Sequence, residues 1–183
     1  MSSLDARVGA RLVRVARGAI AADLGVSAGP TDLEPWPVLD RRGVFVTLRS
    51  GGRLRGCIGT FLPDDDLPRL VRRIAVSAAR DPRFAETPLG AAEMSDLRIE
   101  LSVLSPLRQI EDPLDFELGI HGIHVTQGGD TGCFLPKVAT ENGWDKETFL
   151  SSCCEQKAGL AANAWRAPET EVRVFSVELF GEG

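Results

Sequence analysis

The sequence predicts an α+β fold, built mainly from antiparallel sheets with flanking helices. Residues 97–103 alternate apolar and polar side chains, which is the pattern of a strand that buries one face. Residues 43–49 resemble a second strand, and the glycine-containing segment 50–53 supplies a hairpin turn after it. Helical periodicity is present in two other segments, 3–24 and 64–81. Hairpins and amphipathic helices in one chain are typical of this fold class.

The first predicted helix, residues 3–24, carries apolar side chains at helical spacing and should pack on a sheet. Its arginines fall mostly on another face, where a solvated surface is a simpler explanation than an anionic partner. The segment 27–37, with three prolines, is expected to be a connection. The apolar positions are Leu4, Val8, Leu12, Val15 and Ala19, and the arginines are Arg7, Arg11, Arg14 and Arg17.

The second helix follows the hairpin and should begin after the acidic residues 64–66, with Pro68 in its first turn. It should end at Asp81, because the residue before a proline is pushed out of helical geometry. A last strand is predicted between Val172 and Leu179.

An internal repeat is a further prediction, because residues 122–126 match residues 43–47 at a constant offset. The match continues through the turns and implies two related hairpin-and-helix units, intertwined in one domain of residues 1–183 or forming two tightly joined subdomains. Turn chemistry alone could produce similar glycines. If the repeat holds, Cys57 and Cys133 occupy equivalent places, and a pseudo-twofold axis could pass near them.

The composition restricts the possible partners. The 21 basic and 26 acidic residues give a net charge of -5, which opposes non-specific attraction to nucleic acids and anionic membranes. An aromatic content of 6% without tyrosine offers few platforms for base stacking. No run is long enough to span a membrane, and residues 1–22 lack the apolar centre of a signal peptide, so we expect a cytoplasmic protein. The four cysteines form no C-x-x-C pair and should be reduced thiols.

The heptad 54–60 (LRGCIGT) is the strongest candidate for a functional site. Its thiol, Cys57, stands between Gly56 and Gly59 on the returning strand of the hairpin, where backbone or ligand could approach closely. Arg55 would share a face with Cys57 on a regular strand and could lower the thiol pKa. The heptad therefore suggests a cysteine nucleophile, although Cys57 could equally be a small core residue and Arg55 part of an unrelated salt bridge.

A nucleophile would also need a base, and His121 is the better of the two histidines in the sequence. It could instead fix the turn before Gly122. A metal site is not expected, because His121 and His124 would point to opposite faces of a straight strand and no carboxylate stands at ligand spacing. The glycine-rich segments do not match a phosphate-binding loop, so no cofactor is expected.

Several blocks beyond the heptad make the chain resemble the AMMECR-type domain family, also called protein A of the AmmeMemoRadiSam system. The resemblance covers about residues 10–180 and implies a compact α+β domain that often accompanies a Memo-type protein and a radical-SAM enzyme, without a settled activity. It marks Asp81 and Arg83 as signature positions, where Asp81 could orient an arginine in a cleft or anchor a loop to the sheet. The blocks are 81–84 (DPRF), 99–106, 119–123 (GIHGI), 134–139 (FLPKVA), 143–145 (GWD) and 157–160 (KAGL).

We therefore expect a ligand- or protein-binding accessory of a Memo and radical-SAM system, with a cleft around the heptad. An enzyme that uses Cys57 as nucleophile or transient carrier is the alternative, and a nucleic-acid module ranks last. The candidate catalytic residues are Cys57, Arg55 and His121, and the candidate ligand-binding residues are Gly56, Gly59, Thr60, Asp81 and Arg83.

Overall fold

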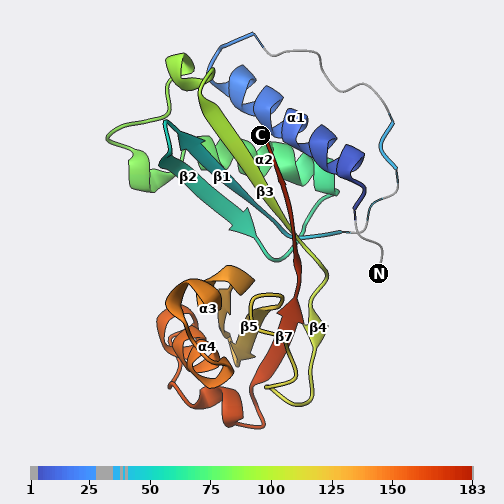
Figure 1. Ribbon diagram of the computed structural model, residues 1–183, viewed down its shortest axis with the longest axis vertical. Coiled ribbons are helices and arrows are strands. Elements are labelled where there is room, and N and C mark those ends of the chain that lie inside the picture. The colour runs from blue at the N-terminus through green and yellow to red at the C-terminus, as the bar shows by residue number, and fades with distance from the viewer. Residues whose placement is uncertain (1–3, 28–34, 38, 40, 183) are drawn as a thin grey trace. The chain divides into compact units, whose positions relative to one another are not determined.

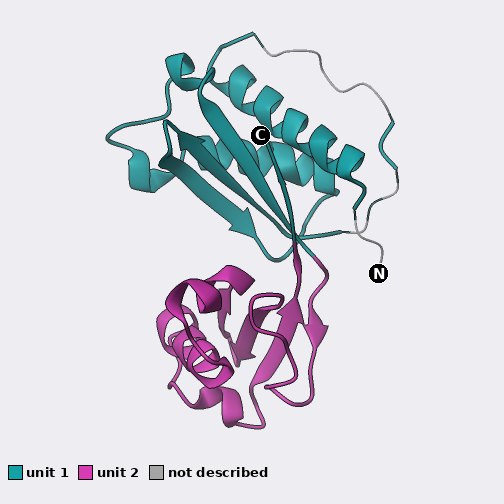
Figure 2. Ribbon diagram, viewed as in Figure 1, with its two compact units in different colours: residues 1–104, 178–183 teal, residues 105–177 magenta. Residues whose placement is uncertain are grey.

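The structure is a computed structural model that describes residues 4–27, 35–37, 39 and 41–182. The chain forms two compact units (Figure 2). Unit 1 comprises residues 1–104 and 178–183, and unit 2 comprises residues 105–177. Unit 2 is therefore inserted into the chain of unit 1. Most of the predicted connection 27–37 lies outside the described residues.

Unit 1 is a four-stranded sheet with two helices on one face, in the strand order β2-β1-β3-β8 (Figure 1). Alternate residues of β1 and β3 are buried and meet the apolar faces of α1 and α2 in one core. Two short 3-10 helices, Pro82–Phe84 and Ala91–Glu93, follow α2. The main elements are α1 (Ala6–Asp23), β1 (Val44–Ser50), β2 (Arg53–Thr60), α2 (Leu67–Ala79), β3 (Leu97–Leu104) and β8 (Val177–Gly181).

The predicted limits of α2 are confirmed by its caps. The Asp66 carboxylate accepts a hydrogen bond from the Arg69 N–H, and Pro68 lies in the first turn. The helix ends at Ala79, before Asp81 and Pro82. No helix among the described residues is long and apolar enough to cross a membrane.

Unit 2 has a second four-stranded sheet, in the order β4-β7-β5-β6, packed against short helices around its own core. A π-helix, Cys154–Ala158, continues α4, and a 3-10 helix, Ala164–Arg166, precedes β7. The α+β class with antiparallel sheets is thus confirmed. The main elements are β4 (Arg108–Gln109), β5 (Gly122–Gln127), β6 (Asp130–Phe134), α3 (Pro136–Asn142), α4 (Lys146–Cys153) and β7 (Glu171–Phe175).

The prediction of one last strand from Val172 to Leu179 is wrong, because the chain changes sheets within it. Strand β7 belongs to the sheet of unit 2, and β8 belongs to the sheet of unit 1. Ser176 separates the two strands, and its N–H donates to the Ser105 hydroxyl at 3.0 Å. Strands β7 and β8 both contain apolar and β-branched side chains, so the composition does not show where the chain passes from one sheet to the other.

Two related hairpin-and-helix units are present. Each sheet places a hairpin beside a third strand, as β2-β1-β3 and as β6-β5-β7, with helices between the hairpin and that third strand in the chain. The cysteines, however, are not equivalent. In the first hairpin Cys57 lies opposite Thr47, and Gly59 lies opposite Phe45. In the second hairpin Cys133 lies opposite His124, which is the counterpart of Phe45. Cys133 therefore occupies the position that corresponds to Gly59. A β-bulge in the first hairpin and a shorter second hairpin explain this shift of two residues.

Candidate functional site

Cys57 lies within β2, an edge strand of the sheet in unit 1. Its N–H donates to the Asp81 Oδ2 atom at 3.0 Å, and its carbonyl accepts from the Arg83 Nη2 atom at 2.9 Å. These are the backbone groups that a neighbouring strand would pair. The side chains of Asp81 and Arg83 therefore close the sheet edge at this residue.

Asp81 and Arg83 form a tight ion pair with a buried carboxylate. The Asp81 side chain is 1% exposed, and the Arg83 Nε and Nη2 atoms donate to it at 3.0 and 2.6 Å. The hydrogen bond from Arg83, supported by the N–H groups of Cys57 and Arg83, lowers the pKa of Asp81 well below its usual range, although burial acts the other way. Asp81 thus contacts both Arg83 and the backbone of the sheet edge at Cys57.

The thiol of Cys57 is half-buried and has polar neighbours. Its Sγ atom lies 3.4 Å from the Thr47 Oγ1 atom across the hairpin. The pKa of Arg83 is raised first by Asp81 and, to a smaller extent, by the charge and hydrogen bonding of Cys57. Arg83 is thus a cation held at the backbone of Cys57, through its hydrogen bond to the Cys57 carbonyl.

Arg55 makes its contacts elsewhere. Its Nε and Nη2 atoms donate to the two Glu93 carboxylate oxygens at 2.8 and 3.0 Å, and Nη2 also donates to the carbonyls of Thr87 and Pro88 at 2.9 and 3.1 Å. The pairing shifts between Leu48 and Arg49, so Arg55 lies in a β-bulge. The rule that residues two apart share a face holds for a regular strand and does not apply across this bulge.

The glycines of the heptad are explained by close packing. A Cβ atom on Gly56 would lie 1.9 Å from the Ala78 carbonyl oxygen, near the end of α2. A Cβ atom on Gly59 would lie 2.3 Å from the Phe45 ring. Thr60 uses its hydroxyl within the chain, since Oγ1 accepts from the Leu62 N–H at 3.2 Å and donates to the Leu62 carbonyl at 3.1 Å.

His121 belongs to unit 2, where it closes a turn. Its Nδ1 atom accepts from the Glu117 N–H at 3.0 Å, and its own N–H donates to the Glu117 carbonyl at 2.9 Å. The described side-chain hydrogen bonds of Cys57 include no histidine. Within the part of the chain that the structure describes, no group of three or more His, Cys, Asp or Glu side chains could hold a metal ion.

A hollow of about 360 Å³ lies in unit 1. No residue of the heptad lines it, but Asp81, which accepts the Cys57 N–H, does. Its walls are the last residues of α1 and α2 and the segment 84–89, and Asp81 forms part of it. Sequence reasoning missed this hollow, because the two helix ends are brought together by the fold and carry no motif. It is lined by Asp23, Leu24, Ala79, Arg80, Asp81, Phe84, Ala85, Pro88 and Leu89.

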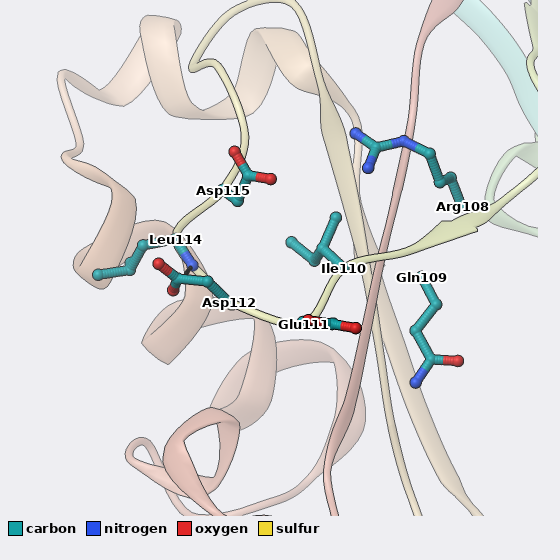
Figure 3. A pocket seen from close by; sticks show the side chains of 7 residues that line it. All are labelled: Arg108, Gln109, Ile110, Glu111, Asp112, Leu114 and Asp115. Atoms are coloured by element: carbon teal, nitrogen blue, oxygen red, sulfur yellow. Dashed lines mark hydrogen bonds between the residues drawn. The ribbon is translucent and has the colours of Figure 1, made fainter.

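A second hollow, of about 520 Å³, lies in unit 2 along β4 and the loop after it, residues 108–115 (Figure 3). Three carboxylates line it, but the Oδ1 atom of Asp112 already accepts the Leu114 N–H at 2.9 Å and so shapes the loop. None of its lining residues belongs to the heptad or to the block 81–84. The hollow in unit 1 is therefore the stronger candidate.

The surroundings of the other three thiols disfavour the reactive thiolate form. Burial raises the pKa of Cys133 to about 11, although Lys157 acts the other way. Burial also raises the pKa values of Cys153 and Cys154. Thiols in such environments are poor nucleophiles at neutral pH.

Comparison with known proteins identifies the family and agrees with the fold. The model of the AMMECR1 family matches residues 13–180. The chain belongs to the AMMECR1 family. A protein of Methanothermobacter thermautotrophicus is 42% identical over 95% of this chain and 94% of its own length. A protein of Methanopyrus kandleri is 40% identical over 93% of this chain and 86% of its own length.

The AMMECR1 fold is also similar to a crystal structure. An uncharacterised protein from Pyrococcus horikoshii, PH0010, is 38% identical and superposes with a TM-score of 0.80, covering 96% of this chain and 92% of that one. The comparison supports the fold and the family, and the names of these relatives assign no activity.

Proposed function

We propose that this AMMECR1-family protein is a binding accessory, and that the hollow in unit 1 is its binding site. One observation carries the proposal: three successive residues of the heptad each contact a different part of the segment 78–93, and residues 79–81, 84, 85, 88 and 89 of this segment line the hollow. Arg55 donates hydrogen bonds to the carbonyls of Thr87 and Pro88. Gly56 has no Cβ atom and so leaves room for the Ala78 carbonyl. Cys57 binds Asp81 and Arg83 through its backbone.

This arrangement makes the heptad a scaffold for the hollow. The polar atoms of Arg55 are engaged by Glu93 and the loop carbonyls, and Asp81 is engaged by Cys57 and Arg83. Interlocked hydrogen bonds of this kind rigidify a site and reduce the ordering cost of binding. A volume of about 360 Å³ lies within the range of about 300–1,000 Å³ that is typical of small-molecule sites.

The partners that we propose are a Memo-type protein and a radical-SAM enzyme, on the strength of the family resemblance. A cytoplasmic location is part of this proposal, since free thiols without C-x-x-C pairs suit a reducing compartment. The accessory would present its bound ligand, or the segment around the hollow, to these proteins.

Titration calorimetry with the purified Memo-type and radical-SAM proteins of the same organism tests the proposal. Ala85→Trp fills the hollow from an exposed lining position and should weaken binding about tenfold or more through steric exclusion. Ala10→Trp, on the exposed surface of α1, is the matched control, and Cys57→Ser should bind like the wild type. Equal binding by Ala85→Trp and Ala10→Trp would contradict the proposed site.

The alternative function is an enzyme with Cys57 as nucleophile. It is favoured by the proximity of Arg83 and Thr47 to the thiol. Labelling of native protein with iodoacetamide, followed by peptide mass spectrometry, tests it. Fast labelling of Cys57 below pH 7, with loss of a substrate-dependent activity in a folded Cys57→Ser variant, would favour the enzyme over the accessory.

A further inference from the structure

Two helix C-termini converge at the hollow of unit 1. Asp23 is the last residue of α1, Ala79 is the last residue of α2, and both line the hollow. The C-terminus of a helix is the negative end of its macrodipole and carries roughly half an elementary charge. At both ends the carbonyls of residues 20–22 and 76–78 also accept N–H groups from the turns that follow. Neither helix has a basic residue in its last turn. The helix ends therefore favour a positive charge in the hollow.

A carboxylate reinforces this preference. The Asp23 side chain is 13% exposed and receives a hydrogen bond from the Arg80 Nε atom at 3.0 Å. Asp23 extends the negative end of its own helix, a position where an acidic side chain is unfavourable without a nearby cation. Asp81, the other acidic lining residue, is compensated by Arg83.

The cation that now meets Asp23 is exposed to solvent. The Arg80 side chain is 68% exposed, and its Nε and Nη2 atoms donate to the two carboxylate oxygens of Asp23, whose side chain is 13% exposed. A ligand cation in the hollow therefore competes with Arg80 for the Asp23 carboxylate.

The rest of the hollow is apolar. Its other lining residues are Leu24, Ala79, Phe84, Ala85, Pro88 and Leu89. Such a lining binds hydrocarbon or an aromatic ring. Charge and apolar surface together define an amphipathic cationic ligand.

We infer that the hollow binds a small organic cation, an ammonium or guanidinium group on an apolar body, with the cation on Asp23 and the apolar body against Phe84 and Leu89. This inference rests on the proposed function and names the ligand class of the same site. Because Arg80 competes with the ligand, its removal should strengthen binding. An anion-binding site would behave in the opposite way.

Titration of the full-length protein with phenethylamine, followed by amide NMR shifts, tests the inference. Phenethylammonium should shift the signals of Leu24, Ala79, Ala85 and Leu89 saturably. Asp23→Asn should weaken the binding about tenfold, and Arg80→Ala should tighten it several-fold, as expected when one charged partner or its competitor is removed. Arg72→Ala removes another exposed charge from α2 outside the hollow and should leave the affinity unchanged.

Two isosteric probes separate failure of the inference from failure of the proposed function. The neutral 2-phenylethanol and the anion 3-phenylpropionate carry the same ring. If either binds the hollow as well as phenethylammonium does, or if Arg80→Ala weakens binding of phenethylammonium, the cation assignment is wrong while the hollow remains a binding site. If no probe shifts these signals and Ala85→Trp leaves partner binding intact, the proposed function fails as well.

Discussion

The hairpins of the two units have the same construction but different surroundings. A glycine stands at the start of each hairpin, where its missing Cβ leaves room for a carbonyl of the returning strand. A Cβ atom on Gly43 would lie 2.5 Å from the Thr60 carbonyl oxygen, and one on Gly122 would lie 2.8 Å from the Phe134 carbonyl oxygen. Both also have a glycine that admits the backbone of a helix, Gly56 against α2 and Gly132 against the π-helix. In unit 1, Asp81 and Arg83 also close the edge of β2, and the segment they belong to lines a hollow.

The comparison separates packing from function. Features found in both hairpins, the glycines and the turns, are what any such unit needs to bring a helix onto a strand. The polar contacts of the heptad with the segment 78–93 belong to unit 1, and they are the features for which packing alone gives no reason. Each hairpin therefore serves as a control for the other.

The largest effect on stability should come from adding a Cβ atom to the glycines at which the two hairpins contact a helix backbone. Gly56→Ala places a Cβ atom 1.9 Å from a backbone oxygen that cannot rotate away, and should destabilise unit 1 by about 3 kcal/mol or more. In Gly132→Ala the added Cβ atom would lie 2.5 Å from the Ala158 nitrogen, and unit 2 should lose somewhat less stability. Amide hydrogen exchange, measured separately in each unit, gives the loss of stability in both variants. Gly18→Ala, which meets nothing within 4 Å in α1, should instead stabilise unit 1 by up to about 1 kcal/mol.

Thiol labelling should differ strongly between the hairpins. Cys57 is half-buried beside Thr47 and Arg83, whereas burial raises the pKa of Cys133 to about 11. At pH 8, iodoacetamide should label Cys133 on the order of 100-fold more slowly than an unperturbed thiol, with a rate that still rises between pH 8 and pH 10. Cys57 should be labelled first. Labelling of Cys133 before Cys57 would contradict the assigned environments.

Asp81→Asn should remove the closure of the sheet edge. An amide keeps one acceptor but directs an NH2 group at the N–H of Cys57 or at Arg83, so we expect a loss of about 2 kcal/mol in the free energy of unfolding. In unit 2, Asp145→Asn replaces the exposed N-cap of α4 by another residue that can accept the Thr148 N–H, and should cost less. Denaturant unfolding of the two variants gives the comparison, and equal losses would argue against a special role for Asp81.

The contribution of Asp81 should also depend on pH. Its pKa is lowered in the folded state, chiefly by the hydrogen bond from Arg83, so its stabilisation is complete above the unfolded carboxyl pKa of about 3.9. The stabilisation is lost as the pH falls below that value. The difference between the wild type and Asp81→Asn should therefore shrink from pH 5 to pH 2, and a constant difference would contradict the assignment.

The smallest effect concerns the two turns. Gly51 and Gly128 have φ angles of +54° and +60°, and a Cβ atom added to either glycine would have no neighbour within 4 Å. Alanine at either position should cost about 1 kcal/mol, because an L-residue is strained in the left-handed region. Thermal unfolding should give similar losses for both variants. A much larger loss at Gly51 would indicate a role for that turn beyond its conformation.

Local signals in the sequence predicted most of the elements. The alternation in residues 97–103, the glycine-rich turns and the proline after Asp81 act within a few residues of the structure they determine. The change of sheets at Ser176 was not predictable, because it depends on which strands lie beside β7 and β8. The register of Cys133 was missed for a related reason, since the bulge at Arg55 and the shorter second hairpin together shift the pairing by two residues.

The site was predicted in part. Asp81 and Arg83, which the family resemblance marks as signature positions, contact Cys57 of the heptad, but Arg55 binds Glu93 and the loop carbonyls. The hollow could not be predicted, because Asp23 and Arg80 are 57 residues apart and meet through the packing of two helices. Neither residue belongs to a motif.

The most direct test of the central claim is a double measurement on Arg55→Lys. If the heptad is a scaffold, losing the fork of hydrogen bonds to Glu93, Thr87 and Pro88 should speed amide exchange in the segment 81–93 and leave the labelling rate of Cys57 unchanged. If the heptad instead activates a nucleophile through Arg55, labelling of Cys57 should change markedly while exchange in that segment stays as in the wild type. That result would contradict the account.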